Sequence, residues 1–279
     1  MTHDSLPAEQ LRNAANRWGT PLYVTDLDAA TARMDAYQSA FPGALVAYAV
    51  KANTDPRLLR RFAASGAGAE VVNAVELAFA LSAGFTAERI VMNGLGKTDV
   101  DHAAADEVGA LVNAESLDEL DLLLALDAAR IGLRLNPGLE ADTHAHLATG
   151  ASNSKFGIAW TDLDAAIDRC RAAGRAIENV GAHIGSAIDD LGAFTRLAEL
   201  LAEAAARAEA TRINLGGGAG TSISVSDLAD AVRADLPDPT RLILEPGRSL
   251  VADAGWLVTR VVRVQPRPEA SLTYLVADA

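Results

Sequence analysis

Short apolar runs alternate with longer segments of helical period along most of this chain. We expect eight strands, at residues 45–50, 69–72, 90–92, 110–112, 131–135, 180–183, 212–215 and 242–244. Apolar residues at helical spacing predict helices at 55–65, 74–83, 99–107, 116–126, 163–173, 191–208 and 225–234. Ser116 and Glu119 are spaced as a capping box. This alternation predicts an α/β fold, a (β/α)8 TIM barrel rather than an open sheet.

Segments at both ends fall outside this pattern. Residues 20–25 form a further predicted strand before the first barrel helix, and 255–264 and 271–277 predict two more, joined by a turn at Gln265-Pro266-Arg267-Pro268. Two or three strands do not make a stable sheet alone. We therefore expect an N-terminal segment with one strand of a β-domain (1–30), a barrel (31–250) and the start of a truncated C-terminal β-domain (251–279).

Composition narrows the class of protein. Of the 279 residues, 50% are hydrophobic, as in globular proteins, and no apolar run approaches the length of a membrane span. The net charge of −13 argues against nonspecific binding to nucleic acid or to an anionic membrane. The first five residues carry no secretory signal, and the single Cys170 suits a reducing cytosol, so we expect a cytoplasmic protein.

Lys51 is a candidate for covalent chemistry. It follows the apolar run Ala47-Tyr48-Ala49-Val50, and the chain contains only three lysines. A lysine at a strand end with apolar side chains behind it is expected to lose its proton easily, and a neutral amine can form a Schiff base with an aldehyde such as pyridoxal phosphate. The alternative is a surface lysine after a strand.

Other polar side chains follow the predicted strands, where barrel enzymes place their active sites. Glu76, Asn93, Arg134 and Asn136 follow or end strands two, three and five, and His183 ends strand six. Asn93 is a candidate for substrate contact, and Glu76 and Arg134 are candidates for supporting roles.

The last two strands are followed by groups suited to a phosphorylated cofactor. Gly216-Gly217-Gly218 follows strand seven, where backbone amides can approach a phosphate, although a plain turn uses glycine equally well. After strand eight, Glu245 could hold a proton on a pyridine nitrogen, and Arg248 could bind a phosphate or carboxylate. The alternative is a structural Glu–Arg pair.

A histidine pair in the loop after strand five raises the question of a metal. His144 and His146 have a possible metal spacing, but no third ligand follows at zinc-site spacing. We therefore expect no metal site.

Several of these segments together resemble one enzyme family. The alanine-racemase-type (fold type III) pyridoxal phosphate decarboxylases are similar in Tyr48-Ala49-Val50-Lys51-Ala52-Asn53, His183-Ile184-Gly185-Ser186, Gly216-Gly217-Gly218 and Glu245-Pro246-Gly247-Arg248, in this order. Arg134-Leu135-Asn136-Pro137, Thr143-His144 and Ser154-Lys155-Phe156-Gly157 resemble the diaminopimelate decarboxylases more than the ornithine or arginine enzymes.

The resemblance implies a role for each group. Lys51 would bind pyridoxal 5'-phosphate as a Schiff base, Glu245 would pair with its pyridine nitrogen, and His183 would stack on its ring. The phosphate or the substrate carboxylate would be surrounded by Ser186, Gly216, Gly217, Gly218, Gly247 and Arg248. The implied reaction is loss of carbon dioxide from meso-2,6-diaminopimelate to give L-lysine.

The resemblance also implies a homodimer, in which a C-terminal β-domain donates a Cys-Glu-Ser segment across the interface. That segment does not occur here, and Cys170 lies in a predicted barrel helix, so we expect the chain to be a fragment. Two alternatives remain: a related decarboxylase of another diamino acid or a siderophore precursor, and a homologue that binds the cofactor without turnover.

Overall fold

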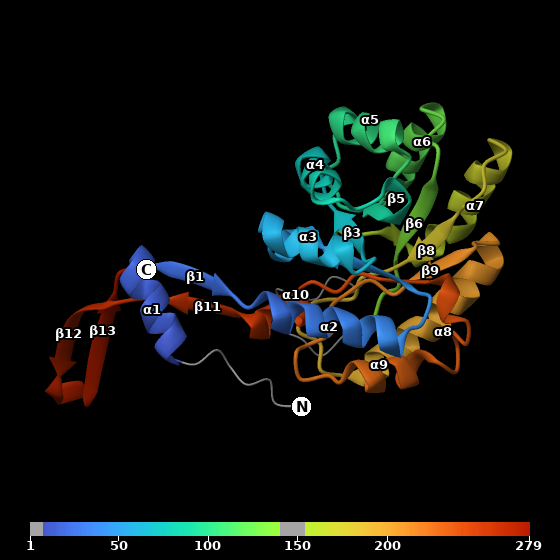
Figure 1. Ribbon diagram of the computed structural model, residues 1–279. Helices are drawn as coiled ribbons and strands as arrows, with labels where there is room; N and C mark the ends of the chain where they lie inside the picture. The colour runs from blue at the N-terminus through green and yellow to red at the C-terminus, as the bar shows by residue number, and fades with distance from the viewer. Residues whose placement is uncertain (1–7, 140–153) are drawn as a thin grey trace.

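Eight parallel strands close into a barrel. In Figure 1 the barrel and its helices lie on one side of the molecule, and an arm that contains β1 and β11 to β13 extends from it. In this computed structural model, which describes residues 8–139 and 154–279, the strands neighbour one another in the order β5-β4-β3-β2-β10-β9-β8-β6, and β6 closes the ring by pairing with β5. They are β2 Leu45–Ala49, β3 Gly68–Val71, β4 Ile90–Met92, β5 Leu111–Ala114, β6 Ile131–Asn136, β8 Asn179–Gly181, β9 Arg212–Asn214 and β10 Leu242–Leu244. The barrel prediction is confirmed.

Helices surround the barrel on its outer side (Figure 1). Those between the strands are α2 Leu27–Ala40, α3 Pro56–Ala64, α4 Ala74–Ala83, α5 Asp99–Val108, α6 Leu117–Ala125, α7 Leu163–Ala172, α8 Leu191–Ala208 and α9 Val225–Val232. The sequence analysis gave no bounds for α2, and it missed α1 Ala8–Trp18, α10 Arg248–Val251 and the short strand β7 Ile158–Ala159. Single 3-10 turns occur at Val50–Ala52, Ala87–Arg89, Trp160–Asp162, Pro239–Arg241, Ala252–Ala254 and Pro268–Ala270.

Local polar contacts explain where the helices begin. The Asn73 side chain accepts a hydrogen bond from the Glu76 amide at 2.9 Å and starts α4, which ends at Gly84 with φ 101°. At α6, Ser116 accepts from the Glu119 amide at 3.1 Å, but Glu119 accepts from the Glu115 amide, not from Ser116. The predicted capping box is therefore only half formed.

Inside the barrel, the layer toward the amino ends of the strands is apolar, and the layer toward their carboxyl ends is polar. Leu45, Ala47, Val91, Leu111 and Ile243 form a buried cluster separate from the larger cluster between strands and helices. Inward positions repeat every second residue of a strand, so Asn93, Asn113 and Glu245 follow Val91, Leu111 and Ile243 toward the carboxyl ends. Polar groups therefore gather where the chemistry is expected.

Two antiparallel strand pairs lie beside the barrel, and one of them joins the N-terminal part of the chain to the C-terminal part (Figure 1). β1 Leu22–Thr25 pairs with β11 Gly255–Val258, and β12 Val261–Arg267 pairs with β13 Leu272–Ala277. The predicted single strand 255–264 is therefore wrong, because two strands with different partners occupy it. The predicted turn is also wrong: the hairpin turns at Pro268–Ala270, and Pro266 stays in β12, where an edge strand tolerates a residue without an N–H.

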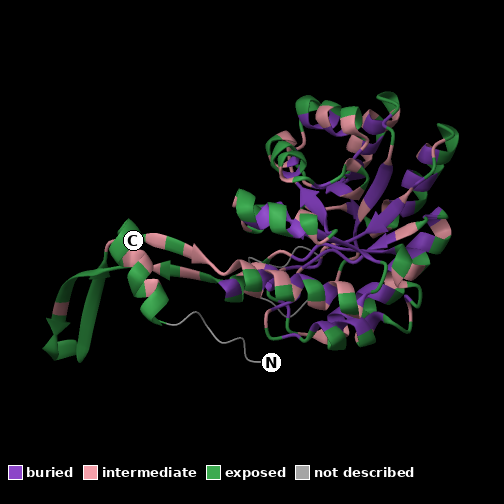
Figure 2. Ribbon diagram, viewed as in Figure 1, coloured by how far each residue is buried: buried purple, intermediate pink, exposed green. Residues whose placement is uncertain are grey.

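Most of the β12–β13 hairpin is coloured as exposed in Figure 2, and several of its exposed residues are apolar. Val262, Val264, Tyr274 and Leu275 are each more than half exposed. Among the described residues, no helix combines the length and the apolar character that crossing a membrane requires.

Candidate active site

A cavity of about 420 Å³ opens at the carboxyl ends of the barrel strands. Its wall collects residues from distant parts of the chain, including Lys51, Asn93, Arg134, Phe156, His183, Ser186, Gly218, Glu245, Gly247 and Arg248. Most of the expected site residues thus meet in one place. Glu76, Gly216 and Gly217 are not in the wall.

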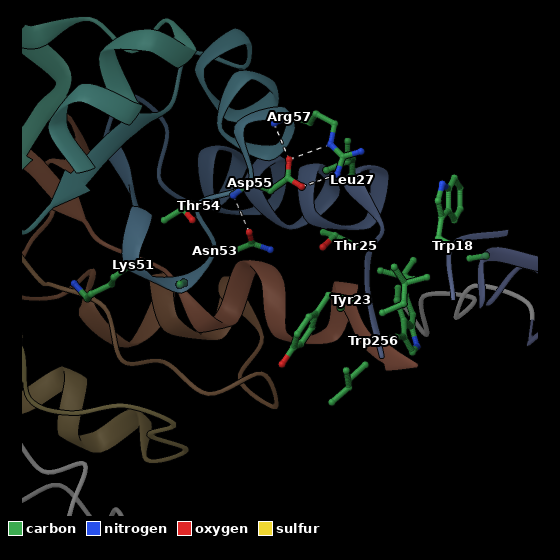
Figure 3. A pocket seen from close by; sticks show the side chains of 16 residues that line it. Trp18, Tyr23, Thr25, Leu27, Lys51, Asn53, Thr54, Asp55, Arg57 and Trp256 are labelled. Carbon is green, nitrogen blue, oxygen red and sulfur yellow. Dashed lines mark hydrogen bonds and ion pairs between the residues drawn. The ribbon is translucent and has the colours of Figure 1, made fainter. Parts of the chain in front are cut away.

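A larger cleft, of about 1000 Å³, adjoins this cavity and shares Lys51 and Ala52 with it (Figure 3). It lies between the barrel and the β1–β11 pair. In Figure 3 the Lys51 amine points away from Tyr23 and Trp256 of this cleft. We place the chemistry in the smaller cavity, because Glu245 and His183 line it and do not line the cleft.

Lys51 is ion-paired with Glu70 of β3. Loss of hydration lowers the pKa of Lys51, but the negative charge of Glu70 and the hydrogen bond to it outweigh that effect, so the pKa is raised. The expectation that Lys51 loses its proton easily is therefore wrong for the protein alone. The sequence argument considered the apolar residues behind the lysine, but not the carboxylate that the neighbouring strand brings to it.

The Glu70 pair predicts a pH effect on cofactor capture. Only the neutral amine attacks an aldehyde, so a raised pKa of Lys51 slows capture at neutral pH. In Glu70→Gln the lowering effect of burial remains, and the larger of the two charges that raise the pKa of Lys51 is gone, with the smaller effect of Glu245 left. We expect the rate at which visible absorption appears, after mixing apoprotein with pyridoxal phosphate, to rise at lower pH than in the wild type.

Glu76→Gln provides the matched control for this experiment. Its carboxylate accepts from the Val72 amide at 3.0 Å and does not contact Lys51. The midpoint of its pH–rate profile should stay close to that of the wild type. Equal shifts in both variants would contradict a specific effect of Glu70.

Glu245 is buried among amide donors at the inner end of the cavity. Asn93 Nδ2 and Asn214 Nδ2 donate to its Oε1 at 2.8 Å and 2.6 Å. Burial and the nearby Glu70 raise the pKa of Glu245, and the two amide hydrogen bonds oppose that rise. A buried carboxylate without a cation of its own is suited to accept a proton or to pair with a cationic group of a ligand.

His183 is held as a neutral imidazole. Burial, with the charges of Arg134 and Lys51, lowers the pKa of His183 to about 3. Its Nδ1 accepts a hydrogen bond from the Gly217 amide at 3.2 Å, which fixes the ring. Across physiological pH the ring is therefore an uncharged flat surface facing the cavity.

The glycine loop packs tightly against two neighbouring strand ends. A Cβ at Gly216 would lie 2.4 Å from the Ala182 carbonyl oxygen, and one at Gly217 would lie 2.3 Å from that of Glu245. Gly216 and Gly218 also have φ values of +65° and +101°, which side-chain-bearing residues rarely adopt. The loop can therefore reach the cavity edge only as glycine.

Anion-binding groups lie at the same edge of the cavity. Arg248 Nε donates to Ser186 Oγ at 3.1 Å, and Arg248 is exposed. The remaining cation, Arg134, donates to Glu115 Oε1 at 2.8 Å and lies 5.1 Å from the centre of the Phe156 ring. Arg134 is thus held by a buried acid, while Arg248 is accessible to a ligand.

The other two lysines are placed differently from Lys51. The Lys97 side chain is fully buried, with its amine 3.0 Å from Glu119 and 3.1 Å from the Asn113 carbonyl oxygen. Lys155 Nζ lies 5.3 Å from the centre of the Phe156 ring, outside the residues that line the cavity. Lys51 is therefore the one lysine in the cavity wall.

Some residues named in the sequence analysis lie outside the part of the chain that the structure describes. His144 and His146 fall in the segment 140–153, as does Thr143. Within 8–139 and 154–279, no three His, Cys, Asp or Glu side chains cluster as metal ligands would.

The sequence analysis missed three residues that contact the expected site residues: Glu70 contacts Lys51, Asn113 contacts Asn93, and Asn214 contacts Glu245. Glu70 could have been found, because it is the one charged residue in the buried strand Gly68–Val71. The asparagines carried no signal of their own, since their roles depend on which strands become neighbours.

The groups present fit pyridoxal phosphate. An amine for the aldehyde, a buried carboxylate for the ring nitrogen and a flat neutral imidazole line one cavity, with a hydroxyl–guanidinium pair at its edge. The larger cleft shares the Lys51 amine, but its acid, Asp55, is only partly buried.

Comparison with known families agrees with this arrangement. Residues 27–252 match the model of the pyridoxal-binding domain of pyridoxal-dependent decarboxylases. The chain belongs to this family. It is therefore a pyridoxal phosphate-dependent carboxy-lyase of the TIM-barrel type.

Relatives of this decarboxylase cover nearly all of the chain. It is 40% identical to a diaminopimelate decarboxylase of Deinococcus radiodurans, over 92% of this chain and 68% of that protein. It is 36% identical to one of Aquifex aeolicus, over 96% of this chain and 68% of that protein. The Helicobacter pylori diaminopimelate decarboxylase, solved with L-lysine, superposes with a TM-score of 0.90 at 29% identity, over 96% of this chain and 73% of that one.

Proposed function

We propose that this decarboxylase acts on meso-2,6-diaminopimelate and releases L-lysine and carbon dioxide, the last step of lysine biosynthesis. The observation that carries the substrate assignment is the 40% identity to a diaminopimelate decarboxylase over 92% of the chain. Likenesses to arginine and lysine/ornithine decarboxylases are at 21% and 19% identity and support the fold alone.

Lys51, Glu245 and His183 would each contact a different part of the cofactor. When bound, pyridoxal phosphate supplies an aldehyde for an amine and an electron-withdrawing ring that takes up the electron pair left by departing carbon dioxide. Lys51 would hold the aldehyde carbon, after its Nζ passes a proton to Glu70 Oε2. Glu245 would keep a proton on the ring nitrogen, and the neutral His183 would lie against the ring face.

The edge of the cavity would hold the anionic groups. Ser186, the Gly218 amide, and Gly247 with Arg248 would surround the phosphate, with Arg248 also available to the substrate carboxylate. Gly216 and Gly217 would shape the loop at this edge, because their amides already donate to Asn214 Oδ1 and to His183 Nδ1. Asn93 remains a candidate for substrate contact, although its amide is committed to Glu245 and Glu70. Arg134 and Glu76 would support the walls.

We also propose a homodimer, a cytoplasmic location and the domain division 1–30, 31–250 and 251–279. The exposed apolar side chains of β12 and β13 support an interface at the hairpin, because such surfaces are usually covered in the working protein. Cys170 is buried and free, as suits a reducing compartment. An amino-acid substrate is the proposed small-molecule partner, with no role for nucleic acid or membrane.

Product formation tests the substrate assignment. The chain with pyridoxal phosphate should form lysine from meso-diaminopimelate, and should form neither putrescine from ornithine nor agmatine from arginine. Faster release of carbon dioxide from another diamino acid would contradict the assignment and favour a related decarboxylase. A cofactor absorption band without carbon dioxide from any substrate would favour the homologue without turnover.

A further inference from the structure

A row of buried asparagines crosses the barrel interior and ends on the carboxylates of the cavity. Asn179 Nδ2 donates to Asn113 Oδ1 at 2.9 Å, and Asn113 Nδ2 donates to Asn93 Oδ1 at 2.8 Å. Asn93 Nδ2 then donates to Glu245 Oε1 at 2.8 Å and to Glu70 Oε1 at 3.3 Å. The three asparagines are at most 4% exposed, so water does not compete for these bonds.

The row has a direction. Each amide oxygen of Asn113 and Asn93 accepts from the asparagine before it, so each amide nitrogen is left for the next group. If Asn93 turned over, its oxygen would face two carboxylates and its nitrogen would face the Asn113 nitrogen, and neither contact is a hydrogen bond. Asn113 therefore opposes the wrong orientation of Asn93.

A glycine on the intervening strand makes room for the row. Gly132 of β6 pairs in register with Asn113 on one side and with Asn179 on the other. A Cβ at Gly132 would lie 2.0 Å from Asn113 Oδ1. The φ of Gly132 is not in the left-handed region, so its backbone conformation does not require glycine. The missing side chain is needed for space, where the two amides meet.

Stability alone does not account for this row. The layer below it is apolar, as barrel interiors usually are. Among the described residues Asn179 Oδ1 is buried without a hydrogen-bond partner, which disfavours folding. Buried amides in a chain that ends on functional carboxylates point to a role in the site.

We propose that Asn113 is a positioning residue, which acts through Asn93 to hold Glu245 as the charged partner of the cofactor's ring-nitrogen proton. This inference rests on the role of Glu245 in the proposed function. Loss of the Asn113 donor frees Asn93 to turn, and an amide oxygen beside Glu245 favours the protonated carboxyl. The proton then moves from the ring nitrogen to Glu245.

The experiment is ¹⁵N NMR of the holoprotein loaded with pyridoxal phosphate that is ¹⁵N-labelled in the ring, because this reports ring protonation without any substrate. In Asn113→Leu we expect the ratio of protonated to unprotonated ring nitrogen to fall about tenfold, the size of one pKa unit. Asn179→Leu leaves the Asn113–Asn93 bond in place and should cause a smaller fall. Gly132→Ala crowds Asn113 without removing a polar group, and it should shift the ratio in the same direction. It is the variant to measure if Asn113→Leu does not fold.

Val112→Ala is the matched control, since Val112 lies on the same strand but packs in the cluster outside the barrel interior. It should lower thermal stability and leave the ring signal unchanged. An unchanged ratio in both Asn113→Leu and Gly132→Ala, or an equal change in Val112→Ala, would overturn the proposal. Glu245→Gln separates the positioning role of Asn113 from the role of Glu245 itself. If only Glu245→Gln shifts the ring signal, the proposal for Asn113 is wrong and the role of Glu245 stands. If Glu245→Gln leaves the ring signal unchanged, the proposed role of Glu245 is wrong.

Discussion

Lys51→Ala should abolish both the visible absorption band of bound cofactor and turnover. The reason is geometric, because Lys51 is the one lysine in the cavity wall, Lys97 is enclosed beside Glu119, and Lys155 lies outside the wall. The measurement is the absorption spectrum after addition of pyridoxal phosphate, followed by borohydride reduction and mass spectrometry of the labelled peptide.

Two variants control for structural effects of this change. Lys51→Arg keeps a cation beside Glu70 but cannot form a Schiff base, so it should fold like the wild type and also lack the band. Lys155→Ala should keep the band. If borohydride reduction of Lys51→Ala fixed the cofactor covalently to another lysine, the assignment of Lys51 would be wrong.

Glu245→Ala is expected to slow decarboxylation far more than it weakens cofactor binding. Its carboxylate would stabilise charge on the ring, and loss of one such electrostatic contact typically lowers kcat by about 10²–10³-fold. The cofactor should stay bound, because Lys51 and the phosphate-binding edge are intact. Steady-state kinetics and cofactor titration measure the two effects separately.

Glu245→Gln provides the closer comparison. The amide oxygen of glutamine can still accept from Asn93 and Asn214, so the hydrogen-bonded framework is kept while the charge is removed. Its kcat should fall as it does in Glu245→Ala, with less loss of thermal stability. Comparable losses of activity and of cofactor affinity in both variants would instead indicate a structural role for Glu245.

The strands and most helices could be predicted because their signals are local. All eight barrel strands occur close to where the apolar runs placed them, and α4 and α8 have the expected bounds. The hairpin near the C-terminus was misjudged for the opposite reason. Residues 255–264 look like one extended segment, but the partner of each half lies elsewhere: β1 for the first and β13 for the second.

The position of each candidate residue after a strand was readable from the sequence, but its chemical state was not. Lys51 was expected to be easily deprotonated from the apolar run before it. Its pKa is raised because the parallel pairing of β2 with β3 brings Glu70 to its amine.

By itself, the sequence determined the order of strands and helices, the barrel class, and the set of polar residues that end the strands. These follow from periodicities of two and about 3.6 residues, which act over a few neighbouring positions. Only the tertiary structure decided which polar groups touch: Asn93 on Glu245 across the barrel, Asn113 on Asn93 from the neighbouring strand, and Glu70 on Lys51. Those contacts join residues 19 to 152 positions apart. Pairing of neighbouring strands brings Glu70 to Lys51 and Asn113 to Asn93, and the closed barrel brings the inward side chains of β4 and β10 close enough for Asn93 to reach Glu245.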